Sequence, residues 1–179
     1  MANTHKLTND ELLKLKAVVL YIVNKCESLD YFHIFKILYF ADRNHYAKYG
    51  RRIIKDSFCA LQNGPVPSAL FDAIKVSSGK CTRVDKSDLN VISDALYSSD
   101  STYSYILSAK ELPDMDELSM SDIECLDSSI EENQAIPFNQ LSKKSHDIAW
   151  QESWNKGSAS KMDDVTMAKA GGATLLRGG

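Results

Sequence analysis

The sequence of 179 residues lacks any long apolar run. Its longest one, Ala17 to Val23, covers seven residues, whereas a helix needs about 20 apolar residues to span a membrane. The first 14 residues, MANTHKLTNDELLK, are polar and lack the apolar core of a signal peptide. We therefore expect a cytoplasmic protein without a membrane segment.

Cysteine is scarce, and its spacing excludes the usual cysteine-based sites. The chain contains four widely separated cysteines, namely Cys26, Cys59, Cys81 and Cys125. No Cys-x-x-Cys pair is present, so neither a zinc site nor a redox pair is indicated. Asp42 and His45 would share one face of a helix, but two ligands do not make a metal site. We expect reduced thiols, no metal and no cofactor.

Common catalytic motifs are missing as well. The sequence has no Gly-x-Ser-x-Gly, no Walker loop, no Gly-x-Gly-x-x-Gly and no His-Glu-x-x-His. Cys59 or Cys125 could form a thiol–imidazole pair with His146, but both lie in apolar stretches, where a thiol is usually inert. We expect no enzyme. A small hydrolase that uses Asp42, His45 or His146 stays open as the less favoured alternative.

Charge is distributed unevenly, although the net charge is only −3. Residues 43 to 55 carry five basic side chains and no acid, whereas residues 111 to 132 carry nine acids and no Lys or Arg. The basic group is too small for a nucleic-acid site and has no aromatic binding motif beside it, so we expect no direct nucleic-acid partner. The acidic run is either a solvated face or a surface that steers a charged partner.

Hydrophobic spacing predicts helices over much of the chain. Thr8-Asn-Asp-Glu11 has capping-box spacing and predicts a helix over residues 9–26. Asp30 is expected to cap a second helix, which ends near Tyr46 or Lys48 at Gly50 and packs antiparallel to the first. Further helices are predicted from Pro67 to about residue 77, from a capping box at Ser121-Asp-Ile-Glu124 to Asn133, and from Pro137 or Phe138 to about residue 145.

Short apolar runs between the helices predict strands at residues 52–54, 58–61, 90–93, 95–97 and 103–107. The sum is a mainly helical α+β domain with a small antiparallel β-sheet. We expect the domain to occupy residues 1–155. Residues 156–179 hold few large apolar side chains, so we expect a flexible or weakly docked C-terminal segment with one frayed helix near residues 162–169.

The stretch FCALQNGPVPSALF, residues 58–71, places a glycine and two prolines between apolar segments. Gly64 allows a positive φ, and Pro65 fixes its own φ, so a rigid connector explains both residues. Alternatively, the connector is the wall of a groove beside the second helix. That helix carries a stripe at i, i+3 and i+7 with residue types typical of interface hot spots, formed by Lys36, Tyr39 and Arg43.

Four segments occur in the order and spacing of a known family. They are FKILYFAD, FCALQNGPVPSALF, SDIECLDSSI with the preceding Leu118-Ser119, and LSKKSHDIAW. Over residues 10–155 the pattern resembles the Panacea domain, which is the SocA-like antitoxin domain also called the phage-associated GepA-like family. The signature positions are Lys36, Tyr39, Asp42, Gly64, Pro65, Val66, Pro67, His146 and Trp150. The chain departs from the family at Leu61, where a tryptophan is usual, and at Ser145, where a threonine is usual.

The resemblance implies an antitoxin of a bacterial or prophage toxin–antitoxin pair that binds and neutralises its cognate toxin. An alternative is a proteolytic adaptor that delivers the toxin to an AAA+ protease, which the SocA-type member resembles. Toxins that act on RNA or nucleotides tend to be basic, so an acidic surface is a plausible contact. The expected partner-binding residues are Lys36, Tyr39, Arg43, Gly64, Pro65, Asp114, Asp116 and Glu117. The signature residues expected to be structural are Asp42, Val66, Pro67, His146 and Trp150.

Overall fold

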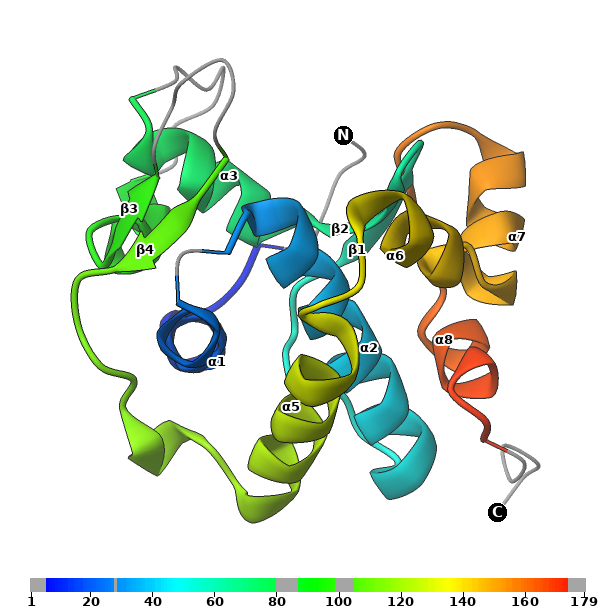
Figure 1. Ribbon diagram of the computed structural model, residues 1–179, viewed down its shortest axis with the longest axis horizontal. Coiled ribbons are helices and arrows are strands. Elements are labelled where there is room, and N and C mark those ends of the chain that lie inside the picture. Colours follow the sequence, from blue (N-terminus) through cyan, green and yellow to red (C-terminus); the bar gives the residue numbers. More distant parts are fainter. Residues whose placement is uncertain (1–5, 28, 80–86, 99–104, 174–179) are drawn as a thin grey trace.

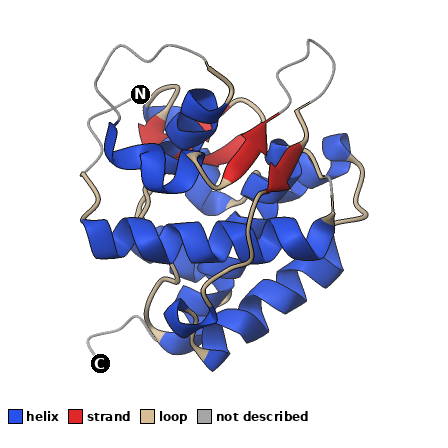
Figure 2. Ribbon diagram, turned by 90° about the vertical axis from the view of Figure 1, so that its left-hand side faces the viewer, coloured by secondary structure: helices blue, strands red, loops and turns tan. Residues whose placement is uncertain are grey.

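The structure is a computed structural model, and it describes residues 6–27, 29–79, 87–98 and 105–173. The fold is mainly helical with small antiparallel sheets, as the sequence predicts (Figures 1 and 2). The helices are α1 (Asn9–Cys26), α2 (Tyr31–Tyr49), α3 (Ser68–Ser77), α4 (Asn90–Ser93), α5 (Met120–Asn133), α6 (Phe138–Ser145), α7 (Ile148–Lys156) and α8 (Asp164–Ala170). Two 3₁₀ turns are η1 (Ser87–Leu89) and η2 (Met115–Glu117).

The caps of the first two helices are confirmed. The Thr8 side chain accepts from the backbone of Glu11, whose carboxylate accepts in return from the backbone of Thr8. Asp30 accepts from the backbone of His33 at the start of α2. Gly50 ends α2 in the left-handed conformation at φ 77°. Both helix boundaries therefore follow from local hydrogen bonds.

Helix α2 forms the centre of the molecule. Its apolar side chains face several directions and are almost fully buried, among them Ile34, Phe35, Ile37, Leu38 and Phe40. A helix that is apolar all round needs neighbours on every side, and α2 packs against α5, α6, α8 and β2. Figure 1 looks along the axis of α1, whereas α2 lies across the view. The expected antiparallel hairpin of α1 and α2 is therefore wrong, because the axes of the two helices cross instead of running side by side.

Two small antiparallel sheets complete the fold. Strand β1 (Phe58–Leu61) lies between β2 (Gly64–Pro67) and β5 (Ser160–Lys161), with Leu61 opposite Gly64 in the tight β1–β2 hairpin. Strands β3 (Leu96–Ser98) and β4 (Leu107–Ala109) form the second sheet. Residues 103 and 104 of the expected fifth strand lie outside the described residues.

Two predicted strands are wrong. Residues 90–93 form the short helix α4, which buries Ile92 and packs on α1 and α3. Residues 52–54 form no strand because the backbone N–H of Ile53 donates to the carboxylate of Asp42 at 2.6 Å. A side chain thus replaces a strand partner, which sequence periodicity does not reveal.

Two helix starts differ by one or two residues from the prediction. The capping box of α5 is formed by Ser119 and Asp122, because the hydroxyl of Ser121 is hydrogen-bonded to His45 at 2.9 Å. Pro67 precedes α3 as its N-cap, so the helix begins at Ser68.

The C-terminal segment contributes to the core, contrary to the expectation from its composition. The side chains of Met162 and Met167 are 1% and 0% exposed. Strand β5 pairs with β1, and α8 packs on α2 and α7 (Figure 1). Met167 lies on α8 and Met162 follows β5, so each is buried where its element packs on the rest of the fold. The domain boundary at residue 155 stays a prediction.

Candidate functional site

The glycine-proline connector closes over the buried Lys36 side chain. Lys36 is 1% exposed, and its Nζ donates to the backbone oxygen of Pro65 at 2.9 Å. Burial lowers the pKa of Lys36 to about 7, although the negative charge of Asp30 opposes this shift. The connector is therefore held to α2 by the amino group of Lys36, which lies away from water and donates a hydrogen bond in either protonation state.

Gly64 is required at this position by both its backbone and its surroundings. Its φ is 119°, a conformation that side chains with a Cβ rarely adopt. An added Cβ would lie 2.2 Å from Ser145 Oγ and 2.7 Å from Lys36 Cε. The backbone of β2 at Gly64 thus approaches side chains of α2 and α6 so closely that a residue with a Cβ would not fit there.

The stripe on α2 ties that helix to α7. The Tyr39 hydroxyl donates to Asp147 Oδ2 at 2.6 Å, and Arg43 Nη1 donates to the same oxygen at 3.1 Å. The other oxygen of Asp147 accepts from the backbone of Trp150 at 2.9 Å and caps α7. The Arg43 guanidinium also lies 4.8 Å from the centre of the Phe40 ring. Sequence analysis missed Asp147, although an aspartate just before an apolar helical run is a recognisable cap.

His146 and Trp150 form a stacked pair at the end of β1, the central strand of the first sheet. Their ring centroids are 3.8 Å apart, and Trp150 Nε1 donates to the backbone oxygen of Leu61 at 2.8 Å. Burial lowers the pKa of His146, the backbone of Gln62 opposes this, and the charge of Lys36 lowers it further. His146 Nε2 is buried without a hydrogen-bond partner in the described part of the chain. The departure at Leu61 leaves this contact intact because Trp150 uses the backbone of that residue.

A second buried network surrounds Asp42. This fully buried carboxylate accepts from Arg52 Nε at 2.6 Å, and Arg52 Nη2 donates to the backbone oxygen of Asp56 at 2.7 Å. The Asp56 carboxylate accepts from the backbone N–H groups of Ala69 and Leu70 at 2.8 and 2.9 Å. Burial raises the pKa of Asp42 and raises that of Asp56 to about 6. Asp56 therefore caps α3 from a distance, and the only hint in the sequence is that Pro67 supplies no side-chain cap.

His45 also has partners within the protein. It is fully buried, and its ring nitrogens lie 2.7 Å from the backbone oxygen of Arg51 and 2.9 Å from Ser121 Oγ. Asp122 Oδ1 lies 3.4 Å from His45 Nε2. In the described ranges, no three His, Cys, Asp or Glu side chains converge as metal ligands. The side chains of Asp42 and His45 thus make separate contacts rather than one site.

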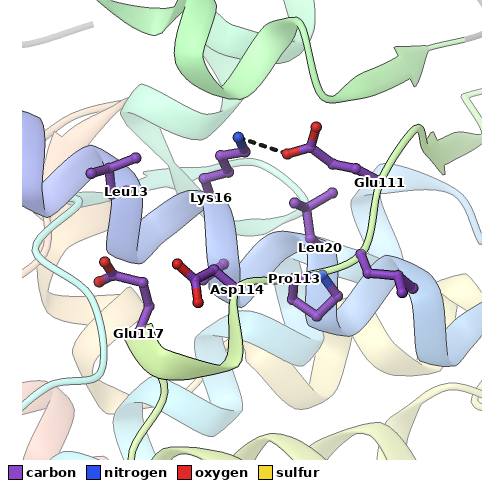
Figure 3. A pocket seen from close by; sticks show the side chains of 9 residues that line it. Leu13, Lys16, Leu20, Glu111, Pro113, Asp114 and Glu117 are labelled. Atoms are coloured by element: carbon purple, nitrogen blue, oxygen red, sulfur yellow. Dashed lines mark ion pairs between the residues drawn. The ribbon is translucent and has the colours of Figure 1, made fainter.

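The remaining candidates, Asp114, Asp116 and Glu117, lie in a different region, between β4 and α5. Figure 3 shows Asp114 and Glu117 beside α1, around a cavity of about 200 Å³. The cavity is lined by Leu13, Lys16, Ala17, Leu20, Glu111, Leu112, Pro113, Asp114 and Glu117. Lys16 pairs with Glu111 at 2.7 Å. Asp114 accepts from the backbone of Asp116, and no described cation forms an ion pair with Asp114, Asp116 or Glu117.

The rest of the acidic run is largely neutralised within the protein. Glu124 pairs with Lys48 and Glu132 pairs with Lys144. The buried Asp122 pairs with Lys14. Asp122 is the one buried acid of residues 111–132, whereas Glu124 and Glu132 stay at least half exposed although they are paired.

The fold and its contacts define a class. This is a mainly helical α+β domain whose polar motif residues bond chiefly to other groups of the protein. The chain belongs to the family described as antitoxin SocA-like, Panacea domain, whose model matches residues 34–151. Searches of the curated proteins and of the solved structures found no match.

Membership of this family supports an antitoxin role in general, a toxin as partner in general, and a non-enzymatic role. Within the described ranges, no helix has both the length and the apolar character needed to cross a membrane.

Proposed function

We propose that the protein is the antitoxin of a bacterial or prophage toxin–antitoxin pair and neutralises its toxin in the cytoplasm by direct binding, without catalysing a reaction. The observation that carries the proposal is the family match over residues 34–151. The internal bonding of the motif residues is consistent with it. Lys36, Tyr39 and Asp42 each contact a protein group from within the core, as scaffold residues of a binding protein would.

The hydrolase alternative is weakened by burial. Asp42 and His45 are 0% exposed, so neither side chain can reach a substrate without a rearrangement of α2. His146 is stacked on Trp150, and its pKa is lowered by burial.

The proposal is tested by co-expression with the product of the adjacent gene. We expect that product alone to arrest growth of a bacterial host, and co-expression of this chain to relieve the arrest and to give a complex that copurifies. The matched control is the same gene with a stop codon in place of the Lys14 codon, which keeps the transcript and removes the protein. A harmless neighbour, or relief by the control, would contradict the proposal.

The fate of the toxin separates neutralisation by binding from delivery to an AAA+ protease. Direct binding predicts a stable complex and an unchanged toxin half-life after protein synthesis is blocked. An adaptor predicts faster loss of the toxin in the presence of this chain, and slower loss when the protease is deleted.

A further inference from the structure

The segment from Glu111 to Met120 presents apolar side chains to solvent. Leu112 is 78% exposed, Met115 is 46% exposed and Met120 is 89% exposed. Next to the cavity of Figure 3 lies a wider depression of about 530 Å³, lined by Tyr21, Asn24, Lys25, Leu112, Pro113 and Met115. The two hollows share Leu112 and Pro113, so together they form one groove between α1 and this segment.

The charges around the groove are mainly negative and in part unpaired. Asp114 and Asp116 are exposed, Glu117 is partly exposed, and no described cation forms an ion pair with them. The two lysines that line the groove have contacts of their own. Lys16 pairs with Glu111, and the ammonium of Lys25 lies 5.5 Å from the centre of the Tyr21 ring. The groove is therefore complementary in charge to a basic partner.

The dimensions favour protein side chains over a small molecule. Pockets for small ligands usually enclose about 300–1,000 Å³ and bury most of the ligand. The smaller hollow, at about 200 Å³, lies below this range. The larger one, at about 530 Å³, lies within it but is open to solvent, so it would leave much of a small ligand uncovered. Exposed apolar side chains with a polar rim are typical of protein–protein contact sites.

We propose that residues 111–120 and the facing side of α1, from Leu13 to Leu20, form the toxin-docking surface. The occupant is a basic segment of the toxin, whose Lys or Arg side chains pair with Asp114, Asp116 and Glu117. An apolar side chain of the same segment fills the hollow at Leu112 and Pro113, and Met115 and Met120 pack around it. This inference rests on the proposed function and adds to it the surface and the chemistry of the partner.

The electrostatic half of the inference is tested by charge reversal. The variant Asp114→Lys/Asp116→Lys/Glu117→Lys is compared with Asp94→Lys/Glu131→Lys/Glu152→Lys, which changes three other acids and gives the same net charge. With the toxin as the probe, we expect association at low ionic strength to slow about tenfold or more in the first variant and by a clearly smaller factor in the control. The dependence of the association rate on salt should flatten in the first variant only. Equal effects in both variants would overturn the inference.

The apolar half is tested by truncation. Met115→Ala and Leu112→Ala, which truncate two apolar side chains that line the groove, should each speed dissociation of the toxin about fivefold or more. The control is Ile148→Ala on α7, because Ile148 is 49% exposed, close to the 46% of Met115, and lines neither hollow. Circular dichroism should show unchanged folding, since none of the altered side chains belongs to the buried core. Unchanged dissociation in both groove variants would contradict this half.

Hydrogen exchange on the wild-type complex locates the surface without any substitution. We expect slower exchange on toxin binding at residues 111–120. Protection confined instead to residues 36–43 and 62–67 would overturn the inference and favour a groove beside α2. Self-association of the chain that is abolished by the triple reversal would also overturn it, because a second copy would then be the occupant. If the wild-type chain neither relieves arrest nor binds the toxin, the proposed function itself fails; if it does both and the groove variants behave as wild type, only the docking surface fails.

Discussion

Two regions of the molecule use polar side chains in opposite ways. Around the β1–β2 hairpin, Lys36, Tyr39 and Asp42 are buried, and each is bonded to a group of the protein. In the segment before α5, Asp114 and Asp116 are exposed beside apolar side chains that nothing described covers. The first region contains much of the family signature, whereas none of the nine signature positions lies in the second.

This difference separates the residues that specify the fold from those that are free to contact a partner. A buried polar group must find a partner of fitting geometry, so such positions tolerate few residue types and produce a recognisable pattern. A surface groove places no such demand on its residues until a partner binds. A partner role for Lys36 and Tyr39 stays a prediction, and it would require α2 and the connector to separate because both side chains are buried.

The largest effect should come from Asp42→Ala in the buried network. It leaves the Arg52 guanidinium, whose side chain is 8% exposed, without its closest carboxylate. We expect a loss of about 3–5 kcal/mol in the free energy of unfolding, measured by urea denaturation. Asp42→Asn should lose less, because its carbonyl can still accept from the backbone of Ile53. If Asp42→Ala were as stable as the wild type, the buried polar residues would not stabilise the fold, and the contrast with the exposed segment before α5 would be lost.

Met167→Ala tests whether the C-terminal helix belongs to the same core. Met167 is fully buried, and truncation of such a side chain costs about 2–5 kcal/mol. On the same helix, Val165 is 44% exposed, so Val165→Ala should change stability by no more than about 0.5 kcal/mol. Thermal unfolding of the pair distinguishes a docked helix from a loose one. If Met167→Ala destabilised the protein as little as Val165→Ala does, residues 156–179 would be a flexible segment, as their composition predicts.

Gly64→Ala separates backbone strain from steric overlap. We expect a loss of about 1–3 kcal/mol, because the new Cβ would meet Ser145 Oγ and Lys36 Cε. Gly172→Ala is the control: its φ is 99°, but nothing lies within 4 Å of an added Cβ, so it reports the backbone cost alone. Adding Ser145→Ala to Gly64→Ala should recover part of the loss in chemical denaturation. If the double variant were no more stable than Gly64→Ala, the loss of stability would come from backbone strain and not from the contact with Ser145 on α6.

Lys36→Met sharpens the comparison through pH. The pKa of Lys36 falls from 10.5 to about 7 on folding, so between these values the unfolded chain binds more protons than the folded one. The free energy of unfolding of the wild type should therefore rise with pH from about 7 to 10 relative to the variant, by at most about 1.4 kcal/mol per pH unit. Denaturation of both proteins at pH 6, 7, 8 and 9 gives the difference. Parallel pH profiles would show that the ammonium is not held in a dry site.

The smallest effect on stability should come from Met120→Ser on the exposed segment. Because Met120 is 89% exposed, we expect the free energy of unfolding to change by no more than about 0.5 kcal/mol. The same substitution should weaken toxin binding. A clear loss of stability would mean that this surface is structural after all, and the contrast between the two regions would disappear.

The sequence predicted those features that depend on neighbours within about four residues. The cap formed by Thr8 and Glu11, the cap at Asp30 and the left-handed stop at Gly50 are all confirmed, because each is completed by a backbone group close in the chain. The order of the motif segments identified the family. The β1–β2 hairpin was recognisable as a connector, but the contact of Gly64 with Lys36 and Ser145 was not.

Tertiary structure alone decided the features that depend on distant residues. Asp56 accepts hydrogen bonds from the start of a helix, at a residue 13 positions later in the chain, and Asp42 replaces a strand partner for Ile53. The helix that carries the buried Met167 packs on α2, more than 100 residues earlier. Asp114 and Asp122 belong to the same acidic run, yet one is exposed and the other is fully buried beside Lys14. Burial and charge pairing depend on which surfaces meet across the fold, and local spacing carries no information about that meeting.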